Sequence, residues 1–415
     1  MRKTALLLIA TSLFFSVPAW ASETDILLRK LVQKGILTEK EAQEVKEEVK
    51  QEAKQNQPVA PSSPKESAVS GIPGWVKQTQ WSGDLRLRFE DQLREPATDR
   101  VRERFRLRFG FITKPWDPLE IGVRLSTGAT GDPVAPNQSF GSTFDKKPIL
   151  IDRAYAKYTP WEWLTAVGGK MEIPFHTVSE TVWDADVTPE GAALQLRAPG
   201  TGPVKLFGNF GAFQIAELNG DAGDPALFGA QGGAEIKLPF KISWKPSVGY
   251  YDFTAIQGTT TANVTNSPAG NTTVTEGAAA KFRDDFNLVA LTSTLNLPPV
   301  FNQPVSLFGD WTRNEEAQED GDAWLAGLEV GKVTEKLGSW KAFYFYKRLE
   351  SDAVFGAITD SDFGGGGTNH KGHRMGVQVG LNKWASLALT YTRTDEVEGT
   401  QNKVDTFQAD ANLKF

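Results

Sequence analysis

The sequence predicts an all-β fold, a transmembrane antiparallel β-barrel of about sixteen strands that follows a short α-helical segment. From Trp75 to Phe415, segments of about ten residues alternate apolar and polar side chains, as strands do between lipid and water. Short and long connections alternate between these segments. After the first residues, no apolar run reaches the roughly 18 to 20 residues that a membrane-spanning helix needs. A membrane location would therefore require a closed barrel, which leaves no backbone group unpaired.

Residues 1–21 are predicted to be a signal peptide. Arg2 and Lys3 precede an apolar run over 5–17, and Ala19-Trp20-Ala21 supplies the small residues that signal peptidase recognises. The chain contains no cysteine, which excludes a disulfide framework, a lipoprotein anchor and covalent haem attachment. The formal net charge of −6 identifies no partner, and no nucleic-acid partner is expected.

Residues 22–55 are predicted to form two short helices. Gly35 separates two amphipathic stretches, and Thr38 with Glu41 has the spacing of a capping box that starts the second helix. The segment is either a helical hairpin packed on itself or a weak coiled-coil seam. Residues 56–74 are rich in Pro, Ser and Gln and are predicted to be a linker. The barrel is expected to occupy 75–415.

Alternation is clearest in the last segment. Phe407, Ala409, Ala411, Leu413 and Phe415 share one face, and the residues between them are polar. The expected strands are 79–91, 100–113, 118–128, 148–158, 163–173, 190–198, 203–216, 226–238, 241–254, 281–296, 304–314, 322–333, 339–350, 372–382, 385–395 and 404–415. Because 226–238 and 339–350 alternate poorly, a count of fourteen or eighteen remains open.

The connections between these segments follow a rule. Every second connection is short, and most of those between are longer and rich in Gly, Asn or Asp, as in 127–147, 174–189, 255–280 and 351–371. Barrels with tight turns on one side of a membrane and loops on the other show this order. Tryptophans fall at or beside the short turns, as in an aromatic girdle at one interface, namely Trp116, Trp161, Trp163, Trp340 and Trp384.

The most distinctive chemistry lies on the first three strands. Arginines alternate with apolar residues there, so all of the arginines of one strand share one face. This face is expected to line the lumen, because an arginine that faces lipid at mid-depth costs about 2 to 4 kcal/mol. This basic wall consists of Arg86, Arg88, Arg102, Arg104, Arg106, Arg108 and Arg124. Either it attracts anions and orients dipolar solutes, or it belongs to a solvated lumen with charges of both signs.

Several patches of sequence resemble the bacterial outer-membrane proteins described as putative porins. They are residues 183–191 (Trp-Asp-Ala-Asp-Val-Thr-Pro-Glu-Gly), residues 31–42, and Asp152-Arg153-Ala154-Tyr155 followed by Gly169-Lys170-Met171. The terminal Phe415 is similar to the C-terminal signal that the barrel-assembly machinery reads. The resemblance implies an outer-membrane channel with the N-terminal segment in the periplasm, and it leaves a homotrimer open.

The same resemblance implies a constriction loop. In sixteen-stranded porins the third extracellular loop folds into the lumen, and here it corresponds to the connection 174–189. Its acidic residues would face the basic wall across the pore, together with the first residue of the next strand; they are Glu180, Asp184, Asp186 and Glu190. Alternatively the loop lies outside, and Asp184 and Asp186 make local turns.

We therefore expect a water-filled channel in contact with outer-membrane lipid. It would pass small polar solutes by diffusion, with a mild preference for anions. The alternative is a structural barrel that encloses a partner such as a multihaem cytochrome. Neither catalysis nor a cofactor or metal is expected, because His176, His370 and His373 are assigned to predicted loops. The preferred solute and the oligomeric state stay open.

Overall fold

The computed structural model describes residues 74–415 except 219–222, 266 and 401, together with Val32, residues 38–41 and Gln43. The chain divides into two units, Met1–Ile72 and Pro73–Phe415. The predicted signal peptide and nearly all of the predicted linker lie outside the described residues, as does most of the helical segment. Within the first unit the capping box is present, because Thr38 N donates to Glu41 Oε2 at 2.8 Å and Glu41 N to Thr38 Oγ1 at 3.4 Å.

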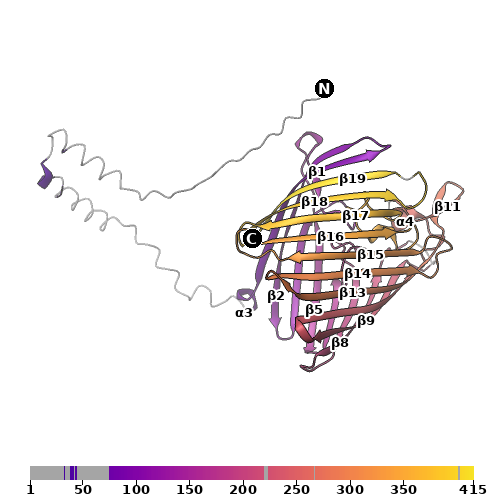
Figure 1. The fold of residues 1–415 in the computed structure, drawn as a ribbon, viewed down its shortest axis with the longest axis horizontal. Coiled ribbons are helices and arrows are strands. Elements are labelled where there is room, and N and C mark those ends of the chain that lie inside the picture. The colour runs from indigo at the N-terminus through magenta and orange to yellow at the C-terminus, as the bar shows by residue number, and fades with distance from the viewer. Residues whose placement is uncertain are drawn as a thin grey trace. The chain divides into compact units, whose positions relative to one another are not determined.

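The second unit is a closed antiparallel barrel (Figure 1). In the described part of the chain one sheet holds seventeen strands, of which β4 (Gln138–Ser139) has two residues and extends the edge of β2. The other sixteen form the wall, and each pairs with its neighbours along the chain. The wall closes where β1 pairs with β19, from Asp84 opposite Lys414 to Glu95 opposite Lys403. The predicted class and the count of sixteen are thereby confirmed.

The wall strands are β1 (Gln80–Glu95), β2 (Arg100–Trp116), β3 (Leu119–Thr127), β5 (Ile149–Trp161), β6 (Leu164–Lys170), β7 (Glu190–Arg197), β8 (Val204–Gln214), β9 (Ala226–Leu238), β10 (Ile242–Thr254), β13 (Phe286–Val300), β14 (Gln303–Asn314), β15 (Asp322–Gly331), β16 (Trp340–Leu349), β17 (His370–Gly380), β18 (Ala385–Glu396) and β19 (Lys403–Lys414). The tenth expected strand begins too early, because 281–285 belongs to the end of a loop hairpin, β11 (Thr273–Glu276) with β12 (Ala279–Phe282), and to the bend after it.

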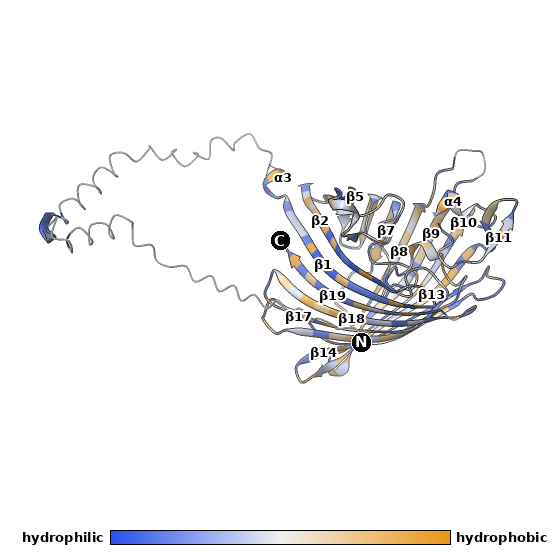
Figure 2. Ribbon diagram, turned by 90° about the horizontal axis from the view of Figure 1, so that it is seen from above, coloured by the Kyte–Doolittle hydropathy of each residue, from blue (hydrophilic) through white to orange (hydrophobic). Residues whose placement is uncertain are grey.

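Hydrophilic and hydrophobic residues alternate along β1 and β19, as Figure 2 shows, and successive side chains of a strand point to opposite faces of the wall. On β1, Leu87 and Phe89 are 43% and 47% exposed on the outer face, whereas Arg88 and Glu90 are buried inside. The outer face is apolar because lipid would cover it, and the inner face carries the charges.

The two ends of the barrel differ. At the end that holds the start of β1 and the end of β19, called the turn end, strands are joined by short turns such as 117–118 and 301–302. Long connections lie at the opposite loop end and include 128–148, 171–189, 255–285 and 350–369. The five tryptophans of the expected girdle are all partly exposed and lie at the turn end.

An apolar cluster fills part of the barrel interior. Phe175 and Trp183 from loop 171–189, Phe282 from loop 255–285 and Phe355 from loop 350–369 pack with Phe253, which faces inward from β10. The inner wall is therefore not uniformly polar. Alternation on the strands assigns faces, but it does not reveal that loops cover one side of the lumen. Among the described residues, no helix has the length and apolar content needed to span a bilayer.

Candidate functional site

The basic wall is built by the register of β1 with β2. Arg86 lies opposite Arg106 and Arg88 opposite Arg104, so four guanidinium groups project from two neighbouring strands toward the lumen. Like charges in such cross-strand positions repel one another. The arrangement therefore requires compensating acids or water.

Acidic side chains compensate most of the basic wall. Arg88 binds both oxygens of Asp410 on β19, with Nε to Oδ1 at 2.8 Å and Nη2 to Oδ2 at 2.9 Å. The carboxylate partners are Glu90, Asp362 and Asp410 for Arg88, Glu90 for Arg102 and Arg104, Asp84 and Asp186 for Arg106 and Arg108, and Asp152 for Arg124. The lumen thus holds charges of both signs in contact, rather than a bare basic surface.

Loop 171–189 folds into the lumen. Asp186 Oδ1 lies 3.4 Å from Arg106 Nη1 and 3.2 Å from Arg108 Nη1, so the loop touches the basic wall at this residue. Trp183 and Val187, on either side of it, are buried in the apolar cluster. Burial of these two side chains holds the loop inside the barrel.

The other three acidic candidates do not face the basic wall. Glu180 lies beside Arg374 of β17, with Oε2 3.8 Å from Nη1. Asp184 is buried, and its oxygens accept hydrogen bonds from the backbone N–H groups of Asp186 at 2.8 Å and Ser361 at 3.0 Å. Glu190 begins β7 and pairs with Lys170 at 2.8 Å, away from the arginines. Of the four carboxylates expected to face the basic wall, Asp186 alone therefore contacts it.

Burial changes the protonation of the two loop carboxyls. Desolvation, and next the charge of Asp360, raises the pKa of Glu180. Desolvation, and next the charge of Glu180, raises the pKa of Asp184. Both groups therefore keep a proton at a pH where a solvated carboxyl has lost it.

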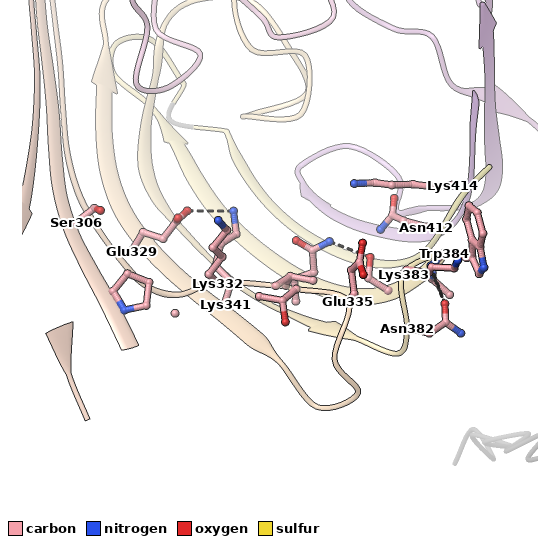
Figure 3. Close-up of a pocket in the computed structure, with 17 residues that line it drawn as sticks. Ser306, Glu329, Lys332, Glu335, Lys341, Asn382, Lys383, Trp384, Asn412 and Lys414 are labelled. Carbon is pink, nitrogen blue, oxygen red and sulfur yellow. Dashed lines mark hydrogen bonds and ion pairs between the residues drawn. The ribbon is translucent and has the colours of Figure 1, made fainter. Parts of the chain in front are cut away.

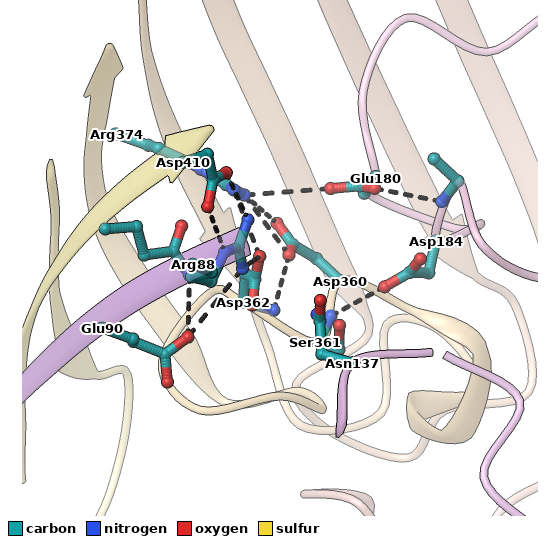
Figure 4. A network of polar contacts seen from close by, with 12 residues as sticks. Arg88, Glu90, Asn137, Glu180, Asp184, Asp360, Ser361, Asp362, Arg374 and Asp410 are labelled. Atoms are coloured by element: carbon teal, nitrogen blue, oxygen red, sulfur yellow. Dashed lines mark hydrogen bonds and ion pairs between the residues drawn. The ribbon is translucent and has the colours of Figure 1, made fainter. Parts of the chain in front are cut away.

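A second loop, 350–369, also enters the lumen, although none of its residues was predicted to belong to the site (Figure 4). Asp360 lies 2.8 Å from Lys347 Nζ and 3.3 Å from Arg374 Nη1, and Asp362 lies 2.8 Å from Arg88 Nη1. Burial raises the pKa of Asp362, but Arg88 and Arg374 outweigh it and hold that pKa below the usual range. Loop 350–369 is thus anchored to β1, β16 and β17.

The sequence carries a signal for this second loop. Apolar residues are unusual in a solvated connection, yet 351–371 contains Val354, Phe355 and Phe363. In the structure all three are buried, and Phe363 also packs under the Lys347 ammonium, 4.3 Å from the ring centre. An apolar run inside a long connection of a barrel indicates a loop that folds inward.

Of the three histidines, His176 lies in a loop as expected, whereas His370 and His373 do not. Both belong to β17, and His373 already falls within the strand expected over 372–382, so their assignment to a loop was wrong. His370 and His373 are three residues apart and point to opposite faces of the strand. Within the described ranges, no group of three or more His, Cys, Asp or Glu side chains could hold a metal ion.

Open space remains on both sides of the inward loops. At the turn end a cavity of about 620 Å³ lies against the inner face of β14 to β19 and the turn 332–339 (Figure 3). At the loop end a cavity of about 690 Å³ is lined by Arg94, Arg100, Arg102 and Arg104 together with Gly364–Gly367. The basic wall therefore borders the space on the loop-end side of the two inward loops, 171–189 and 350–369.

Phe415 lies at the seam of the barrel. Its N–H donates to Gly83 O at 3.0 Å and its carbonyl accepts from Gly83 N at 2.8 Å, while its ring is 55% exposed. A Cβ on Gly83 would lie 2.4 Å from the Phe415 ring. The Phe415 ring thus lies across β1 at Gly83, where any residue with a Cβ would clash with it.

Comparison with known proteins identifies the family. The model of the family described as "Putative porin" matches residues 92–304 and 298–415. The chain belongs to this family. It is accordingly an outer-membrane channel protein, as the resemblance of the patches in its sequence implied. A search of curated proteins found no match.

Solved structures of outer-membrane proteins resemble this porin family member to different degrees. OprB of Pseudomonas putida, in a structure at high pH, has a TM-score of 0.57 at 13% identity, over 81% of this chain and 94% of that chain. A loop L8 deletion mutant of OmpT, an outer membrane protein of Vibrio cholerae, has a TM-score of 0.47 at 11% identity, over 81% and 99%. A triple mutant of the Rhodopseudomonas blastica porin has a TM-score of 0.44 at 10% identity, over 81% and 100%. At these identities the likeness to OprB shows the fold alone.

Proposed function

We propose that this chain is a diffusion channel for small polar solutes and that it prefers anions mildly. The observation that carries the proposal is the constriction, in which loops 171–189 and 350–369 face the arginines of β1 and β2. Paired charges on opposite sides of a narrow passage create a transverse field that orients dipolar solutes. Because Asp84, Glu90, Asp186, Asp362 and Asp410 offset most of the arginines, the preference for anions is expected to be small.

The inward loops favour a solute channel over a sheath for a folded partner. The apolar cluster occupies the lumen beside β8, β9, β10 and β13, and it is anchored by aromatic side chains from three loops. A multihaem cytochrome would have to displace these loops and expose their buried aromatic residues to water, which is unfavourable. A small solute needs no such rearrangement.

The rest of the chain fits the same proposal. Residues 1–21 would be removed during export, 22–55 would lie in the periplasm, and 56–74 would connect them to the barrel at 75–415. The exposed ring of Phe415 would be read by the barrel-assembly machinery. A homotrimer in outer-membrane lipid would be the working state, and crosslinking in membranes would report it.

Planar-bilayer recording tests the channel directly. The purified chain should add conductance in uniform steps, and a potassium chloride gradient should give a reversal potential slightly on the anion side. Refolded, heat-modifiable protein that leaves the bilayer closed would refute the diffusion channel. Isolation of the barrel with a red haem protein bound inside would favour the sheath instead.

A further inference from the structure

Arg86 differs from the other arginines of the basic wall. Among the described residues no carboxylate oxygen lies within ion-pair distance of it, whereas each of the other six has at least one such partner. Its Nη2 donates a hydrogen bond to the neutral amide oxygen of Asn137, at 2.6 Å. Arg86 therefore contributes an uncompensated positive charge to the lumen.

The acids nearest to Arg86 are already engaged. Asp410 lies on β19 opposite Arg88, diagonal to Arg86, and Asp362 lies in loop 350–369; the oxygens of both carboxylates are bound to Arg88. Asp84, two residues away on β1, binds Arg106 and Arg108. A guanidinium enclosed without a counter-charge is costly, so the site would be stabilised by an anion from solution.

The surroundings of Arg86 offer further donors. On β19, Asn412 lies directly opposite Arg86, and Lys414 lies opposite Asp84, so Lys414 is a diagonal neighbour of Arg86, at roughly 7–8 Å. In the part of the chain that the structure describes, Lys414 forms no ion pair. On β2, Arg106 lies directly opposite Arg86, but it is paired with Asp84 and Asp186.

Asn412 and Lys414 also line the turn-end cavity, where Figure 3 shows them beside one another. The cavity carries four lysines, Lys332, Lys341, Lys383 and Lys414, against two acids, Glu329 and Glu335. Lys341 is paired with Glu329 at 3.0 Å. Positive charge is thus in excess along the route from the turn end to Arg86, and an anion that enters there is guided toward it.

We propose that Arg86, with Asn412 and Lys414, forms a binding site for small oxyanions, carboxylate or phosphate, at the edge of the turn-end cavity. A guanidinium presents paired N–H donors in a plane that match two oxygens of such an anion, and the amide and ammonium groups supply further donors. Among the described residues no group accepts a hydrogen bond from Arg86 Nη1, so this nitrogen is available to the solute. The inference rests on the proposed channel and names the chemical class of its preferred solutes.

Conductance in potassium phosphate tests the site. An occupied site limits the current, so the conductance of the wild-type channel should level off as phosphate rises. Arg86→Gln should make this dependence linear and lower the anion-to-cation permeability ratio about threefold or more, as removal of one partly screened charge predicts. Lys414→Gln should weaken saturation without abolishing it.

The matched control is Arg197→Gln. Arg197 ends β7 at the turn end, is 61% exposed, and lies 3.9 Å from Glu235, so its loss removes the same charge from the same end of the barrel. It should leave phosphate saturation unchanged. Arg86→Lys keeps the charge without the planar donors, so it should retain the anion preference and saturate only at higher phosphate.

The possible failures are distinguishable. A linear phosphate dependence in the wild-type channel, or equal effects of Arg86→Gln and Arg197→Gln, would overturn the site while the channel stands. Heat-modifiability on gels would show that each variant is a folded barrel, and Arg86→Lys decides the question if Arg86→Gln does not fold. A wild-type protein without conductance steps would overturn both proposals.

Discussion

Asp184 joins the two inward loops, because its Oδ2 accepts a hydrogen bond from the N–H of Ser361 at 3.0 Å. Asp184 N also donates to Ile358 O at 2.7 Å, and Thr359 Oγ1 donates to Thr181 O at 2.7 Å. The loops 171–189 and 350–369 are therefore one structural body. A change at either loop should alter the constriction as a whole.

The contact between these loops should weaken as pH rises. Desolvation, and next the charge of Asp360, raises the pKa of Glu180 to about 7, and desolvation, and next the charge of Glu180, raises the pKa of Asp184 to about 9. Both groups bind protons more tightly in the folded loops than in opened ones. The stability that the two protonated carboxyls give to the folded loops is therefore fully present below the ordinary carboxyl pKa. It is lost as pH rises through about 7 for Glu180 and then about 9 for Asp184.

Ionisation should also add negative charge beside the pore. Between about pH 5 and about pH 10, the reversal potential should shift toward cations and the current should become noisier. Glu180→Gln with Asp184→Asn should flatten both changes. A wild-type channel whose selectivity is the same at both ends of this range would contradict the assignment.

Asp360 should anchor loop 350–369. Asp360→Asn leaves Lys347 and Arg374 buried without this counter-charge, a loss that commonly costs about 3 to 5 kcal/mol. Amide hydrogen exchange in 351–369 should then accelerate about 100-fold or more. Glu276→Gln, in the exposed pair with Lys281, is the control and should change little. Unchanged exchange in Asp360→Asn would mean that the apolar cluster alone holds the loop.

Neutralising two paired arginines should make the channel prefer cations. Arg104→Gln with Arg106→Gln leaves Glu90, Asp84 and Asp186 with fewer counter-charges, so the lumen becomes more negative. The reversal potential in a potassium chloride gradient should move to the cation side.

The control for that pair removes the same charge from the other face of the wall. Arg313 and Arg393 share the outward parity of Trp311 and Tyr391, so Arg313→Gln with Arg393→Gln should leave selectivity as it was. Equal shifts in the two double variants would mean that net charge, and not the lumen, sets selectivity.

The seam at Gly83 should be intolerant of a side chain. Gly83→Val would place Cβ 2.4 Å from the Phe415 ring, so the last strand could not close in this register. The yield of heat-modifiable barrel should fall severalfold. Gly168→Val is the matched control, because a Cβ on Gly168 of β6 meets nothing within 4 Å. A normal yield from Gly83→Val would show that the Phe415 ring moves aside freely.

Much of the barrel wall was predictable from the sequence, since its features are local. Whether a side chain faces lipid or lumen depends on parity within one strand, so the inward position of Arg104 and Arg106 followed from the alternation around them. Turn and loop lengths are also local, and they predicted sixteen strands in the correct order. Phe343 and Phe345 obscured the pattern on β16 because they face inward against Phe308, Leu325 and Phe363.

By itself, the amino-acid sequence determined the class of fold, the approximate strands and the inward face of the seven arginines of the basic wall. Only the tertiary structure decided which acid meets which arginine, that loop 350–369 enters the lumen, that Glu190 pairs with Lys170, and that Arg86 is left without a carboxylate. The physical reason is the separation along the chain of the residues that determine each feature. The face of a side chain is set by its position within one strand. Charge pairing depends on residues far apart in the chain, such as Arg88 and Asp362, which come together only when the sheet closes and the loops pack inside it.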